Sequence, residues 1–165
     1  MLRLDKQALE KHVEAIDTLA RLKLGNQVHG DLTDLELLQR IINERLIASD
    51  DSALMQSAGV VLGNVLANEL GLKWMVYEDR LGRSRAICVN DSSNCLFPVT
   101  MLSRRLEVNA PVDVQRIYND AVATIDPFIP DNNAYDGKKA EPKKDPGWSA
   151  IKKKPDNKIR IRTYP

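Results

Sequence analysis

The stretch that decides the fold is GVVLGNVLANELGLKWMVY, residues 59–77, where the hydrophobic pattern changes from helical to extended. In its first part, apolar or small residues occupy nearly every side of a helix, which is typical of a helix that is buried all round. Gly59 and Gly63 lie inside this helix, and an interior glycine costs about 1 kcal/mol relative to alanine. We therefore expect another backbone to approach closely at these positions. Gly71 ends the helix, and a strand rich in aromatic and branched residues follows.

Two further helices are expected before this stretch. Apolar residues recur at three- to four-residue spacing from Asp5 to Leu24, and Gly25 is a natural end for that helix. A second helix is expected to begin at Thr33, because Thr33 and Glu36 form the Thr-x-x-Glu pattern of a capping box. The segment Asp50–Ser52 should end this second helix and cap the buried third one.

The sequence after residue 72 predicts a small antiparallel sheet followed by helices. Residues 73–78 and 85–89 form a hairpin across a turn, and residues 95–97 could add a third short strand. Helices are predicted over 99–106 and, with the most regular apolar stripe of the chain, over 114–125. Because the strands cluster instead of alternating with helices, the predicted class is α+β: N-terminal helices, a sheet of two or three strands, then C-terminal helices.

Composition divides the chain into a predicted single domain, residues 1–129, and a basic tail, residues 130–165. The first part carries fourteen Lys/Arg and eighteen Asp/Glu, a net charge of −4, and the tail carries ten against five, a net of +5. Proline and lysine dominate the tail, so we expect little ordered structure in most of it. Residues 158–164 differ, because apolar and basic side chains alternate there as in a strand that could pair with a sheet edge. The residues of this predicted strand are Ile159, Arg160, Ile161, Arg162 and Tyr164.

No pattern of known chemistry stands out, and the sequence predicts no catalytic residue, cofactor or metal site. Phosphate-cradling glycine loops, nucleophile elbows and paired Cys-x-x-Cys or His-Glu-x-x-His motifs are absent from the sequence. Cys88 and Cys95 are interpreted as reduced, ordinary small hydrophobes, with a disulfide across a hairpin as the alternative. The N-terminus lacks the apolar core of a signal peptide, and no run approaches the roughly 18 apolar residues of a membrane span. We therefore expect a cytoplasmic protein.

A polar cluster beside the hairpin is the candidate cleft or interaction surface. Adjacent arginines on a helix point about 100° apart, so at most one of Arg104 and Arg105 faces inward. That arginine could bind a carboxylate or phosphate, and the alternative is an ion pair with the acidic body. The alternative for the other charges is exposed turn residues that contribute little. The candidate residues are Glu69, Trp74, Tyr77, Glu78, Arg104 and Arg105.

The middle of the chain resembles a bacterial domain family of unknown function. The resemblance is carried by a Leu-Gly helix, a Leu-Gly-Leu-x-Trp strand and a Phe-Pro-x-x-Met helix. In this sequence these are Leu62-Gly63, Leu66, Glu69-Leu70-Gly71-Leu72 and Trp74, then Leu96-Phe97-Pro98, Met101 and Arg104-Arg105. It covers residues 53–106 and implies a related fold and a bacterial source. It brings no catalytic residues.

Three functions follow as hypotheses. The first is a non-enzymatic protein-interaction protein of the immunity or adaptor kind, which engages a protein partner through the acidic body or the terminal strand. The second is a ligand-binding or enzymatic domain with a cleft near the Trp74 hairpin. The third is nucleic-acid association through the lysines of the tail, although few aromatic residues are present there to stack on bases.

Overall fold

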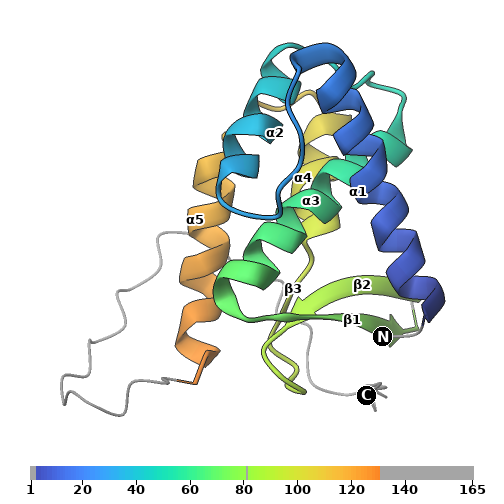
Figure 1. Cartoon of the computed structure of the whole chain (residues 1–165). Helices are drawn as coiled ribbons and strands as arrows, with labels where there is room; N and C mark the ends of the chain where they lie inside the picture. The colour runs from blue at the N-terminus through green and yellow to red at the C-terminus, as the bar shows by residue number, and fades with distance from the viewer. Residues whose placement is uncertain (1–2, 81, 131–165) are drawn as a thin grey trace.

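The computed structural model describes residues 3–80 and 82–130, which form helices before and after a small antiparallel sheet (Figure 1). The elements are α1 Arg3–Leu24, α2 Thr33–Asn43, α3 Ser52–Leu70, β1 Lys73–Asp79, β2 Gly82–Cys88, β3 Cys95–Leu96, α4 Pro98–Glu107, α5 Val114–Ile125 and a short 3-10 turn Asp126–Phe128. This order confirms the predicted α+β class, with the third strand present. The predicted pairing of residues 158–164 with the sheet lies outside the described residues.

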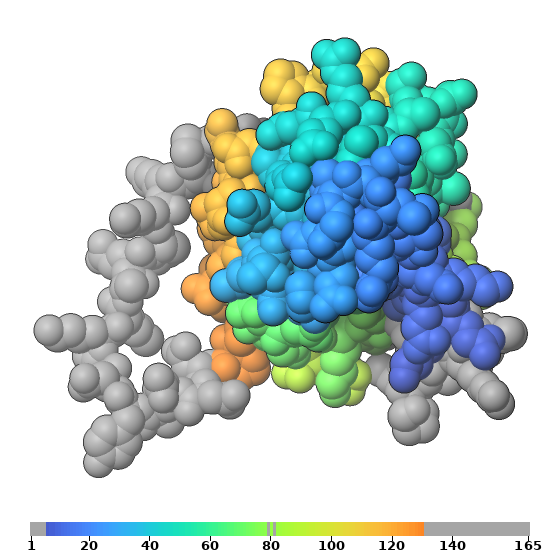
Figure 2. All heavy atoms as spheres, turned by 45° about the horizontal axis from the view of Figure 1, so that its top comes forward, coloured from blue at the N-terminus to red at the C-terminus, as the bar shows by residue number. Residues whose placement is uncertain are grey.

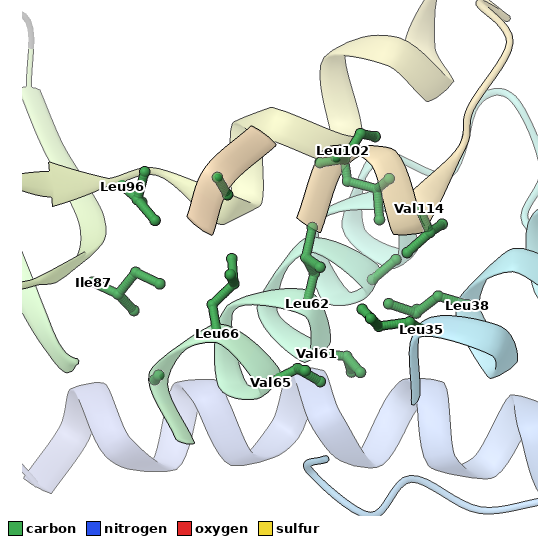
Figure 3. Close-up of a cluster of buried hydrophobic side chains, with 14 of the residues drawn as sticks. Leu35, Leu38, Val61, Leu62, Val65, Leu66, Ile87, Leu96, Leu102 and Val114 are labelled. Carbon is green, nitrogen blue, oxygen red and sulfur yellow. The ribbon is translucent and has the colours of Figure 1, made fainter. Parts of the chain in front are cut away.

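Helix α3 is the centre of the molecule, as its apolar composition predicts. The other helices pack around it, and side chains from all sides meet at Leu62 and Leu66, both fully buried. Figure 3 shows Leu35 and Leu38 of α2 approaching α3 from one side and Leu102 of α4 from another, with Ile87 and Leu96 of the sheet near Leu66. One continuous apolar core therefore joins the helices to the sheet.

Both interior glycines of α3 are closely approached, but the predicted backbone contact holds only at Gly59, because the groups nearest to Gly63 are side chains. A Cβ atom on Gly59 would lie 2.6 Å from Val99 Cα and 2.9 Å from the Pro98 carbonyl oxygen. On Gly63 it would lie 2.5 Å from the Trp74 indole. The first turn of α4 and the start of β1 thus rest directly on the α3 backbone.

Among the described strands the sheet has the order β1-β2-β3, which places β1 at an edge. Strands β1 and β2 pair from Lys73↔Cys88 to Asp79↔Gly82, and β2 and β3 pair at Ile87↔Leu96 and Cys88↔Cys95. The interpretation of the cysteines as reduced is wrong: a disulfide joins Cys88 to Cys95. The strand register explains it, because it places the two residues opposite each other with their Cα atoms 4.1 Å apart.

Carboxylates, and not the predicted capping box, organise the start of α2. Leu32 occupies the N-cap position, with no side-chain cap. The Thr33 hydroxyl and main-chain N–H both donate to Asp31. Asp34, fully buried, accepts hydrogen bonds from the main-chain N–H groups of His29 and Gly30 at 2.9 and 2.7 Å. The local pattern failed here because a tighter Asx-type interaction competes for the hydroxyl.

The predicted end of the second helix at Asp50–Ser52 is wrong, because α2 ends at Asn43 and Arg45 adopts a positive φ of 51°. The predicted ends of α3 are confirmed. The Asp51 carboxylate caps α3 by accepting from the Leu54 N–H, and Gly71 ends α3 in the left-handed conformation with φ of 65°. Within residues 3–80 and 82–130, every helix is too short or too polar to cross a lipid bilayer.

Candidate functional site

A groove of about 820 Å³ lies between helix α1 and strand β1. Helix α1 slants across the molecule and reaches the hairpin with its N-terminal end (Figure 1). Its wall of the groove is a single stripe at helical spacing, and the opposite wall is four consecutive residues of β1. The α1 wall comprises Lys6, Leu9, Glu10, Val13, Glu14, Asp17 and Arg21; the remaining lining residues are Val28, Asn64, Lys73, Trp74, Met75, Val76 and Asp91.

The groove combines apolar walls with a charged rim. Leu9 is buried and Val13, Trp74 and Val76 are half-buried, so they form its apolar part. The Trp74 indole N–H donates to Asn64 Oδ1 at 2.8 Å, which fixes the ring against α3. Apolar walls with a few placed polar groups are typical of binding sites.

The rim carries more acidic than basic residues, and part of its negative charge is unneutralised. Lys6 and Glu10 approach to 4.0 Å, and Arg21 lies 2.6 Å from Asp17. The other two rim carboxylates make no ion pair with any described residue. These are Glu14 and Asp91. A bound group with positive charge would meet these two carboxylates and also Lys73, which likewise makes no ion pair with a described residue and offsets part of their charge.

The outer edge of β1 is open to the groove. Val89 donates its N–H to the Asn94 carbonyl, which places the hydrogen-bonding groups of residues 87 and 89 toward β3. Successive residues of a strand point their main-chain N–H and C=O groups to opposite neighbours. The main-chain groups of residues 86 and 88 therefore point to β1, and those of their partners Met75 and Lys73 point to β2. The N–H and C=O groups of Trp74 and Val76 therefore point outward. These outward groups are a template for an added strand.

Helix α1 is held firmly as the second wall. His12 Nδ1 lies 2.8 Å from the Ser57 hydroxyl of α3, which itself donates to the Ala53 carbonyl. Burial, with the nearby Arg85 charge, lowers the pKa of His12 below its ordinary 6.5. Asp17 accepts the Val28 N–H at 2.8 Å, and this bond lowers the pKa of Asp17, as does the Arg21 side chain. Figure 2 shows α1 and the connection that follows it, in blue, across one face of the molecule.

Only one of the residues predicted as a cleft lines this groove, namely Trp74. Tyr77 packs edge-to-face on Phe97 with ring centroids 5.5 Å apart, and Glu78 is exposed opposite Arg83. Glu69 is exposed at the end of α3. Burial of the Tyr118 hydroxyl raises the pKa of Tyr118, and the negative charge of Glu69 raises it further.

The two arginines of α4 also lie away from the groove. Arg104 is exposed, and Arg105 is half-buried and donates to the Met101 carbonyl. Neither forms an ion pair with a described residue. The structure therefore does not gather the six residues into one cleft.

Sequence reasoning missed the α1 wall entirely. The signal available was the run of carboxylates Glu10, Glu14 and Asp17 beside the apolar stripe, but periodicity does not reveal which helix lies next to β1. Within residues 3–80 and 82–130, no cluster of His, Cys, Asp or Glu side chains could hold a metal ion.

Comparison with known proteins identifies the family. Residues 34–118 match the domain of unknown function DUF3806, and the chain belongs to that family, as the resemblance predicted. A crystal structure from Bacteroides thetaiotaomicron VPI-5482 has a similar fold, with a TM-score of 0.67 and 16% identity over 74% of this chain. The chain covers 45% of that protein, less than half its length. None of the curated proteins compared with the sequence matches it.

Proposed function

We propose that this DUF3806 member is a non-enzymatic interaction module that binds an extended segment of a protein partner by adding it as a strand to β1. The carrying observation is that the groove runs along the edge of β1 that pairs with no described strand, with four consecutive β1 residues in its wall. Main-chain hydrogen bonds to an edge strand supply affinity, and the wall opposite selects side chains. Helix α1 is that wall.

The chemistry of the groove defines the segment. Every second side chain of an added strand would point to the same side of the extended sheet. Apolar side chains on one face would contact Leu9, Val13 and Trp74, and a net positive charge on the segment would suit a rim with four carboxylates and three basic residues. We therefore propose a partner segment in which apolar and basic residues alternate. Residues 158–164 of this chain have that pattern, and the corresponding heptapeptide is a suitable first probe.

Amide exchange by NMR tests this directly. The experiment uses the full chain with Ile159→Asp and Ile161→Asp, so that its own segment does not compete, and adds the peptide of residues 158–164. We expect protection of the outward amides of Trp74 and Val76, with no change at the inward Met75. A peptide of the same composition without alternation is the control. Equal exchange with both peptides would refute strand addition.

A matched pair of α1 substitutions locates the binding. Val13→Asp places a charge in the groove, while Leu22→Asp places one on the same helix at a side chain that is 78% exposed. We expect the first to abolish peptide binding and the second to leave it unchanged, with circular dichroism confirming that both variants fold. Loss of binding in both would place the contact elsewhere.

A small-molecule ligand is the second candidate for the same groove. Its volume of about 820 Å³ falls within the roughly 300–1,000 Å³ of ligand pockets. A thermal-shift screen of metabolites tests it, and a stabilising hit lost in Val13→Asp would favour this function. Nucleic-acid association through the tail is a further proposal, tested by the salt dependence of binding.

Cytoplasmic location and an immunity-like role stay proposals. The Cys88–Cys95 disulfide weighs against the first, since disulfides persist mainly in oxidising compartments.

A further inference from the structure

A second pocket, of about 320 Å³, lies on the other side of β2, where the first turn of α4 approaches it. Strand β3 pairs only with the last part of β2, so the earlier part of that edge borders this pocket. By the alternation described above, the main-chain N–H of Arg85 points to this side. The polar lining comes from Gln56 of α3, Arg83, Ser84 and Arg85 of β2, and Thr100 of α4.

Arg85 is the unexplained residue of this pocket. It is half-buried, and its Nε atom is buried with no hydrogen-bond partner in the part of the chain that the structure describes. Arg85 makes no ion pair with any described residue. A buried guanidinium N–H without an acceptor is costly, and native structures rarely leave one unmatched. The position therefore calls for an acceptor.

The surroundings of Arg85 all favour negative charge. Among the described residues that line the pocket, none is acidic. Helix α4 begins here without a side-chain cap, so the positive end of its dipole adds to the field. The Gln56 and Ser84 side chains make no hydrogen bond within the described residues and are further donors. His12, next to Arg85, is neutral or positive and so cannot neutralise the guanidinium.

We propose that this pocket binds an oxyanion, the phosphate or carboxylate group of a small solute, with Arg85 as its principal ligand. The planar guanidinium matches the two oxygens of such a group through paired N–H···O bonds. The site is separate from the groove between α1 and β1, and the inference does not rest on the function proposed for that groove.

NMR on the full chain tests the site with inorganic phosphate, acetate and, at matched ionic strength, sodium chloride. We expect the Arg85 Nε–H signal to shift and saturate with phosphate or acetate and not with chloride. Saturation by phosphate alone assigns the site to phosphate compounds, and saturation by acetate alone assigns it to carboxylates. A linear, unsaturated drift with all three salts would overturn the proposal.

Substitutions provide the second readout. Arg85→Gln should weaken phosphate or acetate binding, followed through the Val99 amide, by about tenfold or more. Arg116→Gln removes an exposed charge outside the pocket and should leave it unchanged. If Arg85 were only structural, Arg85→Gln would lower stability while the anion shifts at Val99 persisted, and the proposal would fail.

The titration of His12 is an independent check. The pKa of His12 should rise when a bound oxyanion offsets the Arg85 charge, and it should rise in Arg85→Gln without any anion. An unchanged titration in saturating phosphate would contradict an anion next to Arg85.

Discussion

Asp34 is a fully buried carboxylate whose hydrogen-bond donors are main-chain groups, the N–H groups of His29 and Gly30. It therefore fixes the connection between α1 and α2 in place. We expect Asp34→Ala to lower the free energy of unfolding by about 1–3 kcal/mol, because two amides lose their acceptor. Urea denaturation measures this. Glu36→Ala is the matched control on the same helix: it should change stability by less than about 0.5 kcal/mol, whereas a working capping box would make it costly.

His12 gives the fold a pH dependence whose direction follows from its environment. Burial, and then the Arg85 charge, lower the pKa of His12 below the 6.5 of an unfolded histidine. Below that value the unfolded chain binds more protons than the folded one, so the free energy of unfolding should fall as pH drops through about 6.5. Urea denaturation at a series of pH values between 7.5 and 5.5 checks this. In His12→Gln the slope in this window should flatten, and an unchanged slope would assign it to another group.

At the scale of elements, the contact between α3 and α4 depends on the absence of a side chain. Gly59→Ala should raise helix propensity, yet the added Cβ would lie 2.6 Å from Val99 Cα. We expect the steric conflict with that backbone to outweigh the gain in helix propensity, so that the free energy of unfolding falls by about 1–3 kcal/mol. Gln56→Ala, exposed on the same helix, is the control. A stabilised Gly59→Ala would mean that α4 moves away freely.

The disulfide between β2 and β3 should stabilise the end of the sheet. Its cysteines are seven positions apart in the sequence, and closing so short a loop in the unfolded chain contributes about 2 kcal/mol. Reduction should therefore lower the unfolding midpoint in urea, while a Cys88→Ser, Cys95→Ser double variant should not respond to reductant. Alkylation followed by mass spectrometry checks the bond: free thiols in the unreduced protein would contradict it.

The helices and strands also show which features of the fold can be predicted from the sequence. Helix α3, its two glycines and the hairpin can be predicted from local pattern. A helix buried on all sides is apolar all round, and the strands show alternating apolar residues. The Asp34 anchor, the Cys88–Cys95 bond and the groove wall on α1 cannot be predicted in this way. The Asp34 anchor depends on the conformation of the connection before α2, the disulfide on the register of β2 and β3, and the groove wall on how α1 packs. Residue order alone settles none of these. Trp74 was foreseeable as a site residue because it follows the buried helix directly. Val13 was not.

At the scale of the whole molecule, one apolar core connects every helix to the sheet, and this makes a prediction about cooperativity. Leu62 is fully buried on α3 and belongs to the core cluster that connects the helices to the sheet. Leu62→Ala should cost about 2–5 kcal/mol through lost burial and the cavity left behind. If residues 1–129 fold as the predicted single domain, that loss should appear equally in the slowest-exchanging amides of α1, β2 and α5. Native-state hydrogen exchange measures it, with Leu22→Ala as an exposed control that should change none of them. Protection lost in one region alone would divide the chain into separate folding units, and the groove between α1 and β1 would then lie at a boundary able to open.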